Sequence, residues 1–76
     1  MKNCTKSAIE KELKRARKKF PSHPVEYLDR AAIMVEEAGE TIQAALKFKY
    51  ENGSEKDIQK EAIHTAAMAI RLLEGF

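Results

Sequence analysis

The sequence predicts an all-α protein. Apolar residues recur at intervals of three and four along three segments, at about residues 5–19, 24–51 and 54–74. Pro and Gly separate these segments, and none of them shows the alternation of apolar and polar residues that is typical of β-strands. With 76 residues in total, we expect one domain, residues 1–76.

The first predicted helix, at about residues 5–19, is a charged rod with a narrow apolar face. That face repeats at intervals of four, three and four residues and comprises Ile9, Leu13, Ala16 and Phe20. Ser7 and Glu10 have the spacing of a capping box, in which each side chain accepts a hydrogen bond from the other's backbone N–H. Pro21 and Pro24 end the helix because proline cannot continue its hydrogen-bond pattern.

The second predicted helix runs from about Pro24 to Glu51, with Ser22 or His23 as its N-cap. It carries the longest apolar stripe of the chain. At its end, residues 52–53 (Asn-Gly) are typical of a left-handed helix stop.

The third predicted helix starts after Ser54, an expected N-cap with Asp57 three residues later, and ends near Glu74 with Gly75 as the stop. It is apolar around most of its circumference, which predicts burial on more than one side. Because its connection to the second helix is short, we expect the two to form an antiparallel hairpin at about residues 24–74.

So small a chain needs additional stabilisation. A domain of this size buries only about 60% of the surface that its unfolded chain exposes. Cys4 is the single cysteine, which excludes an intrachain disulfide and a cysteine-based zinc site. We therefore expect a homo-oligomer, a dimer or a tetramer, that completes a four-helix-bundle core.

The net charge of +2 conceals two opposite halves. Residues 1–20 carry eight Lys or Arg and two Glu, a net charge of +6, whereas residues 21–76 have a net charge of −4. No apolar stretch approaches the roughly 20 residues that a membrane span requires. The first six residues lead into no apolar segment, so we expect no signal peptide and a cytoplasmic protein.

The basic segment Lys14–Lys19 has two interpretations. It has the charge to contact phosphates or a nucleic-acid backbone. However, no aromatic residues lie among the cations to stack on bases, and no recognisable reading helix follows. This favours a solvated helix face or a cationic arm that complements the acidic body, so nucleic acid is not an expected partner.

Two acidic groups are the candidate site. Glu36, Glu37 and Glu40 lie on neighbouring angles of the second helix, and Glu61 and His64 share a face of the third. In an antiparallel hairpin the two groups stand at comparable heights. Facing carboxylates need a compensating cation, and hard divalent ions accept several carboxylate oxygens.

A solvated glutamate face is the other interpretation of these residues. Gly39, inside the acidic group, costs roughly 1 kcal/mol relative to alanine in a helix. Because a glycine permits close helix approach, Gly39 predicts that the acidic region lies near an interface.

At these residues the sequence resembles a known family. The segment Glu36–Glu40 (EEAGE), 20 intervening residues and then Glu61–His64 (EAIH) resemble the E-E-x-x-E…E-x-x-D signature of the MazG-like, all-α nucleoside triphosphate pyrophosphohydrolases. The resemblance implies an oligomeric helical protein, a dimer or a tetramer, that cleaves a nucleoside triphosphate to a monophosphate and pyrophosphate with Mg²⁺. It also implies that Glu37, Glu40 and Glu61 bind the metal and that Glu36 places or activates the attacking water.

One position departs from the family pattern. His64 replaces the last acidic ligand, and imidazole suits Mn²⁺ or Zn²⁺ better than Mg²⁺. His64 therefore has three interpretations: a metal ligand, a residue that orients a carboxylate, or the mark of a site that has lost activity.

Lys47, Lys49 and Tyr50 are candidates for contacting the phosphates or ribose. The alternative function is a non-catalytic helical homo-oligomer, a degraded relative that acts as an interaction or nucleic-acid-associated module through the basic helix.

Overall fold

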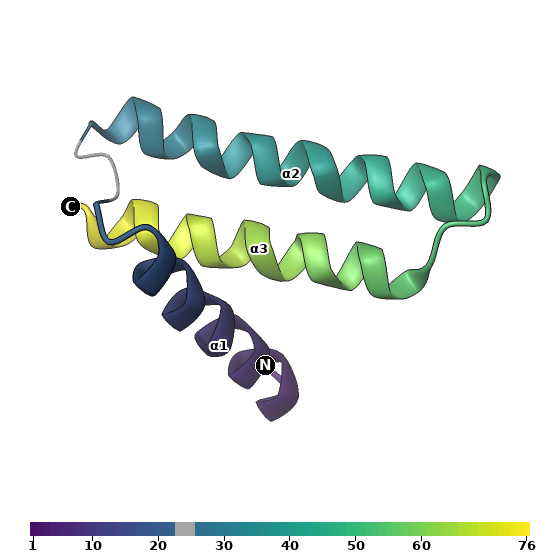
Figure 1. Cartoon of the computed structure of the whole chain (residues 1–76), viewed down its shortest axis with the longest axis horizontal. Coiled ribbons are helices and arrows are strands. Elements are labelled where there is room, and N and C mark those ends of the chain that lie inside the picture. Colours follow the sequence, from purple (N-terminus) through teal and green to yellow (C-terminus); the bar gives the residue numbers. More distant parts are fainter. Residues whose placement is uncertain (23–25) are drawn as a thin grey trace.

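In the computed structural model, which describes residues 1–22 and 26–76, the chain forms three α-helices. Helix α1 spans Asn3–Lys19, α2 spans Tyr27–Tyr50 and α3 spans Glu55–Glu74. No strand occurs in the described residues, so the all-α prediction is confirmed. Helices α2 and α3 run antiparallel side by side, and α1 crosses α3 at an angle (Figure 1). None of these helices combines the length and the apolar character that a membrane crossing needs.

Two predicted helix caps, at Ser7 and Ser22, are wrong. Helix α1 begins at Asn3, after Lys2, and no side chain caps it, so Ser7 lies inside the helix and does not cap it. The spacing of a capping box does not by itself stop the preceding residues from joining the helix. Helix α2 begins at Tyr27 and its N-cap is Glu26, whose carboxylate accepts a hydrogen bond from the Leu28 N–H, so Ser22 is not the cap. The expected cap at His23 and start at Pro24 lie outside the described residues.

In the turn between α2 and α3, Asn52 and Gly53 have different structural roles. Asn52 adopts the left-handed conformation, with φ of 60°, whereas Gly53 does not. Gly53 is needed for another reason: a Cβ there would lie 2.8 Å from the backbone nitrogen of Phe48. The Ser54 hydroxyl oxygen then accepts a hydrogen bond from the Asp57 N–H at 3.2 Å, as predicted for the N-cap of α3.

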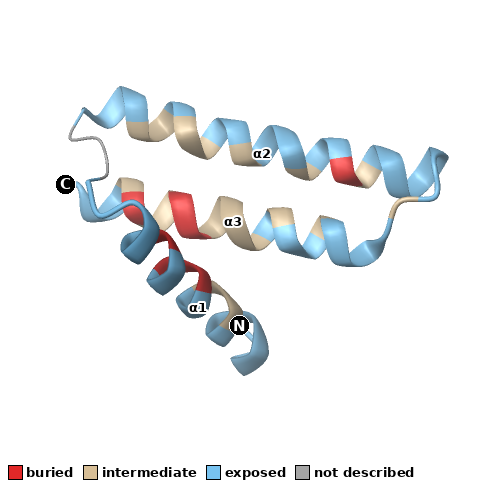
Figure 2. Ribbon diagram, in the orientation of Figure 1, coloured by how far each residue is buried: buried red, intermediate tan, exposed pale blue. Residues whose placement is uncertain are grey.

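The core lies where α1 crosses α3. Its buried members come from these two helices, which both carry buried positions near their crossing in Figure 2; they are Leu13, Ala16, Ala67 and Met68. Ile33 and Met34 of α2 also pack against this cluster, and α2 lies along α3. Helix α3 is therefore buried on two sides, which confirms the prediction from its broad apolar surface.

Charged residues fasten α1 to the end of α3. Arg71, only 6% exposed, donates hydrogen bonds to the backbone carbonyl oxygens of Phe20, at 2.9 Å, and Ala16, at 3.5 Å. On the surface, Arg17 of α1 pairs with Glu74 of α3 at 2.6 Å. These contacts support the interpretation of the basic helix as an arm that complements the acidic body.

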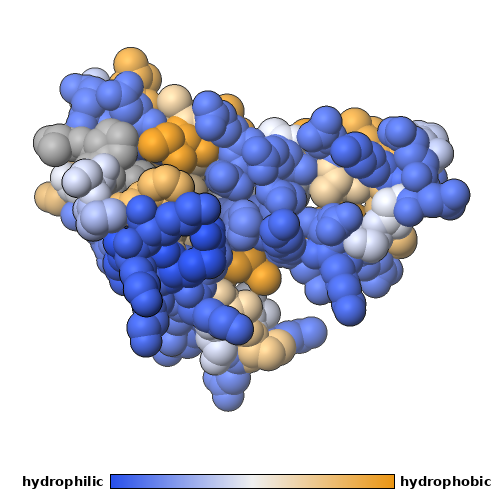
Figure 3. Space-filling view, in the orientation of Figure 1, coloured by the Kyte–Doolittle hydropathy of each residue, from blue (hydrophilic) through white to orange (hydrophobic). Residues whose placement is uncertain are grey.

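Hydrophilic residues cover most of the face seen in Figure 3.

The expectation that Gly39 marks a close helix approach is wrong within this chain. Gly39 is exposed, and a Cβ built on it would meet no described atom within 4 Å. Helix α2 approaches α3 through its opposite face, where Ala44 is buried. Glu37, two residues before Gly39, therefore reaches the interface from a different angle of the helix than Gly39 does.

Candidate metal centre

Glu37 of α2 and Glu61 and His64 of α3 come together between the two hairpin helices. Each offers one ligand atom, and the three atoms lie within 4.8 Å of one another. All three residues are half-buried. The structure thus brings together one residue of the first acidic group and both residues of the second.

A pair of threonines fixes the height at which these residues face each other. The hydroxyl oxygens of Thr41 on α2 and Thr65 on α3 lie 3.1 Å apart. Thr41 is within 3.0 Å of the Glu37 carbonyl oxygen and Thr65 within 2.9 Å of the Glu61 carbonyl oxygen, so each threonine sits one turn beyond its glutamate. This polar contact across the hairpin sets Glu37 opposite Glu61.

The electrostatics of the cluster suit a cation. Oε2 of Glu37 and Oε2 of Glu61 are buried, and neither has a hydrogen-bond partner in the described residues. Burial raises the pKa of Glu61, and so do a shared hydrogen bond with Glu40 and the charges of Glu40 and Glu37, while His64 opposes the shift. Two buried carboxylate oxygens without hydrogen-bond partners, beside an imidazole nitrogen, form a donor set for a divalent ion, and the imidazole favours Mn²⁺ over Mg²⁺. The residues therefore fit a metal ion.

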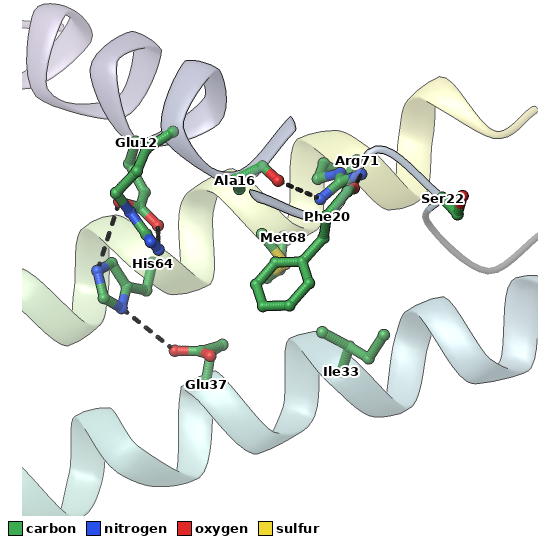
Figure 4. Close-up of a pocket in the computed structure, with 10 residues that line it drawn as sticks. Glu12, Ala16, Phe20, Ser22, Ile33, Glu37, His64, Met68 and Arg71 are labelled. Carbon is green, nitrogen blue, oxygen red and sulfur yellow. Dashed lines mark hydrogen bonds and ion pairs between the residues drawn. The ribbon is translucent and has the colours of Figure 1, made fainter. Parts of the chain in front are cut away.

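A fourth residue reaches the cluster from α1. The Nε2 atom of His64 lies 3.6 Å from Oε1 of Glu12, and its Nδ1 lies 3.6 Å from Oε2 of Glu37 (Figure 4). Glu12 is 9% exposed and accepts two hydrogen bonds from Arg15, at 2.7 and 2.6 Å. These bonds outweigh burial and lower the pKa of Glu12, and the charge of His64 lowers it further. Glu12 is therefore a carboxylate held next to the imidazole.

A cavity of about 310 Å³ opens beside Glu37 and His64, between α1 and the hairpin. Its other walls combine apolar side chains with two arginines and comprise Glu12, Arg15, Ala16, Phe20, Ser22, Ile33, Met68 and Arg71. In Figure 4 the Phe20 ring projects into this space between Met68 and Ile33. The cavity thus offers an aromatic surface close to the candidate metal ligands.

Glu40 and Lys47 border a second hollow, of about 260 Å³, on the other side of Glu61. Gln43, Ala44 and Asp57 complete its lining. Lys47, a candidate for contacting substrate, therefore lies in the same hollow as two candidate metal ligands, Glu40 and Glu61. Glu40 itself is exposed and is not one of the three clustered residues.

Three candidate residues lie outside the cluster and outside both hollows. Glu36 is exposed, about 100° around α2 from Glu37. Lys49 and Tyr50 are exposed at the end of α2, where the ammonium group of Lys49 lies 5.2 Å from the centre of the Tyr50 ring. The structure gives these three residues no contact with the clustered ligands.

Sequence reasoning missed Glu12 and Thr41. The signal for Thr41 was present, because Glu37–Thr41 and Glu61–Thr65 share a spacing of four residues. Glu12 carried a weaker signal: it is one of two acidic residues in the basic first helix. Its position beside Leu13 and Ala16 turns it toward α3, but the sequence does not specify which residue of α3 it meets.

Comparison with known proteins adds no further constraint. The chain matches no protein-family model, no curated protein and no solved structure.

Proposed function

We propose that the protein is a divalent-metal-dependent hydrolase that converts a nucleoside triphosphate, NTP or dNTP, to a monophosphate and pyrophosphate. One observation carries the proposal: donor atoms of Glu37, Glu61 and His64 converge within 4.8 Å, and two of the carboxylate oxygens are buried without a hydrogen-bond partner. The resemblance of the two acidic segments to the MazG-like signature supports the choice of reaction.

In this proposal Glu37, Glu61 and His64 hold the ion. A divalent ion at such a site neutralises phosphate charge and lowers the pKa of a bound water. His64 makes Mn²⁺ the better-matched ion and Mg²⁺ the weaker one. Glu40 lies beside Glu61, whose pKa it helps to raise, and its carboxylate is a further oxygen donor next to the three clustered residues.

Two of the hollows beside the cluster suggest how a nucleotide is oriented. Lys47 supplies a cation on the side of Glu61 and Glu40, suited to phosphate oxygens. The cavity on the side of Glu37 offers the Phe20 ring and apolar neighbours, suited to a base. We assign the phosphates to the 260 Å³ hollow that Lys47 borders and the nucleoside to the 310 Å³ cavity that Phe20 lines.

The proposed role of Glu36, placing or activating the attacking water, rests only on the resemblance to the MazG-like signature. Its exposed position leaves it outside the cluster. Comparing Glu36→Gln with Glu37→Gln therefore tests this assignment: equal losses of turnover support it, and full turnover in Glu36→Gln removes it.

The test is to incubate the pure protein with a panel of NTPs and dNTPs in Mn²⁺ or Mg²⁺ and to measure pyrophosphate. We expect release with at least one nucleotide, loss of release in Glu61→Gln, and full release in the control Glu10→Gln, which changes an exposed residue of α1. Absence of release with every nucleotide, together with no rise of Tm in Mn²⁺, would overturn the proposal.

The basic helix is tested in parallel as a nucleic-acid module. Arg15 and Arg17 are engaged by Glu12 and Glu74 of the same chain, which favours an intramolecular role. A salt-sensitive DNA affinity that disappears in Lys14→Glu/Arg17→Glu, in a protein without hydrolase activity, would establish the alternative.

A further inference from the structure

A third hollow, of about 540 Å³, lies between the N-terminal halves of α1 and α3. The two helices pack together around Leu13 and Met68 and diverge from this crossing toward their N-terminal ends, which leaves the space between them open (Figure 1). Glu12 and His64 form the wall that this hollow shares with the 310 Å³ cavity. The third hollow therefore lies next to the candidate metal centre but is separate from the two hollows described above.

Two pairs of basic residues line this hollow, one pair from each helix. Lys11 and Arg15 belong to α1, and Lys56 and Lys60 belong to α3. Within each pair the residues are four positions apart, so their side chains leave the same side of the helix about 6 Å apart along its axis. We name this hollow the cationic groove. The rest of its lining comprises Ala8, Glu12, Gln59, Ile63 and His64.

The positive charge of the groove exceeds its negative charge. Glu12 is the single acidic residue among the described residues that line it, and Arg15 already binds the Glu12 carboxylate at 2.7 and 2.6 Å. Lys11, Lys56 and Lys60 remain. Within residues 1–22 and 26–76, none of these three side chains forms a hydrogen bond or an ion pair. The groove thus gathers three ammonium groups that have no anionic partner in the described chain.

These positive charges repel one another. Like charges four residues apart on one helix are unfavourable, and the groove brings two such pairs together from different helices. An anion between the pairs would attract both helices and offset the repulsion. Binding of an anion is therefore expected to be favourable in itself and to hold α1 more firmly against α3.

We propose that the cationic groove binds a short oligophosphate, a chain of two or three phosphate groups that is either free or carried by a nucleoside. Lysine ammonium groups are compact point charges that suit phosphate oxygens. A single phosphate carries about two negative charges at neutral pH, fewer than the three ammonium groups, whereas a chain of two or three phosphates carries enough to match them. The inference does not depend on the proposed function, because Glu37, Glu61 and Lys47 do not line the groove.

A nucleic-acid strand suits the groove less well. Proteins that bind single strands combine cations along the backbone with aromatic side chains on which the bases stack. No aromatic residue is among the described residues of the groove, and its aliphatic lining is limited to Ala8 and Ile63. This lining favours a ligand that is recognised through its phosphates alone.

The test is isothermal titration of the full chain with inorganic triphosphate in EDTA, so that no metal ion bridges the ligand and the carboxylates. We expect binding that weakens as the salt concentration rises from about 50 to 200 mM, and weaker binding of orthophosphate. Lys56→Gln/Lys60→Gln is expected to lower the affinity for triphosphate at least about 10-fold. The matched control is Lys14→Gln/Lys18→Gln, which removes the same charge at the same spacing from exposed positions of α1 outside the groove and should keep most of the affinity.

Lys11→Gln tests the α1 side of the groove and is also expected to weaken binding. Because the substituted lysines are all exposed, circular dichroism should show unchanged helical content in each variant. If Lys56→Gln/Lys60→Gln unfolds, Lys11→Gln decides, with Lys14→Gln as its control.

A parallel titration with ATP separates the two sources of the phosphate chain. Binding of ATP at least as tight as that of inorganic triphosphate, and lost in Lys56→Gln/Lys60→Gln, assigns the groove to a nucleotide. Weaker binding of ATP assigns it to a free phosphate chain, and either result supports the proposal. No binding of triphosphate, orthophosphate bound as tightly, an equal loss in the control variant, or binding of a single-stranded oligonucleotide in place of triphosphate would each overturn it.

Discussion

The Nε2 atom of His64 lies 3.6 Å from a carboxylate oxygen of Glu12, although 51 residues and a change of helix separate the two in the chain. On its other side, Nδ1 of His64 faces Glu37 at 3.6 Å. An Nε2–H directed at Glu12 leaves the lone pair of Nδ1 on the side of the acidic cluster. Carboxylates behind ligating histidines act in this way: they fix the tautomer and the ring orientation.

Glu12→Ala is therefore expected to weaken Mn²⁺ binding by about 10- to 100-fold, the usual cost of losing an outer-shell partner. Isothermal titration with Mn²⁺ measures it, with Glu10→Ala as the matched control on the exposed face of α1. Glu12→Gln, which keeps an acceptor oxygen, should retain more affinity than Glu12→Ala. Equal affinities in Glu12→Ala and the wild type would contradict the assignment, whereas a wild type that binds no Mn²⁺ would contradict the metal site itself.

Glu61→Gln is expected to have opposite effects on stability and on metal binding. Burial raises the pKa of Glu61 above its ordinary value of 4.5. The folded protein thus holds a proton that the unfolded chain releases, and this contribution to stability is complete at low pH and is lost as the pH rises through the folded-state pKa.

In EDTA, Glu61→Gln should therefore melt at a higher temperature than the wild type at pH 8, with the difference shrinking toward pH 4. In Mn²⁺ the wild type should gain in Tm and the variant should not. Thermal melts across this pH range measure both effects. A variant less stable than the wild type at pH 8 in EDTA would show that the carboxylate is not penalised by burial.

Arg71→Met is expected to loosen α1. The substitution removes the Arg71 donor from the carbonyl oxygen of Phe20, whereas the Ala16 carbonyl oxygen keeps its bond from the Phe20 N–H, and we expect a cost of about 1–3 kcal/mol in the free energy of unfolding. The control is Arg17→Met, which removes an exposed ion pair with Glu74 worth about 0–1 kcal/mol. Urea unfolding compares the two variants, and the prediction does not hold if Arg17→Met is the more damaging change.

Two glycines are expected to respond to alanine with opposite signs. At Gly53 a Cβ would lie 2.8 Å from the nitrogen of Phe48 and 2.9 Å from the carbonyl carbon of Lys47, so the turn must shift and the protein should lose at least about 1 kcal/mol. At Gly39 a Cβ meets nothing within 4 Å, and alanine should stabilise helix α2 by about 1 kcal/mol. Urea unfolding measures both, and a destabilising Gly39→Ala would indicate that another molecule approaches this position.

The helices and their hairpin follow largely from the sequence, because local signals control them. The Asn52–Gly53 turn, the Ser54 cap and the apolar period predict where α2 ends and α3 begins. The starts of α1 and α2 were predicted less well. A cap-like spacing at Ser7 does not exclude a helix that starts earlier, and the cap of α2 is a glutamate, Glu26, which the usual preferences rank low.

The sequence predicted only part of the candidate site. Spacings of three and four place Glu61 and His64 on one face of α3, and the register of a short hairpin brings them opposite Glu37. The rotation of α2 about its own axis is a property of packing, however. It turns Glu37 toward α3 and leaves Glu36 and Gly39 exposed, which the sequence pattern alone did not distinguish.

The sequence by itself determined three helices, an antiparallel hairpin and an acidic surface near its middle, since each depends on residues within a few turns of one another. Tertiary structure decided which carboxylates converge, that Glu12 joins them from α1, and that α1 shields one side of the hairpin and not the other. These outcomes depend on the angle at which α1 crosses α3. That angle follows from how Leu13 and Ala16 fit against Ala67 and Met68 and from the buried hydrogen bonds of Arg71, contacts between residues more than 50 positions apart.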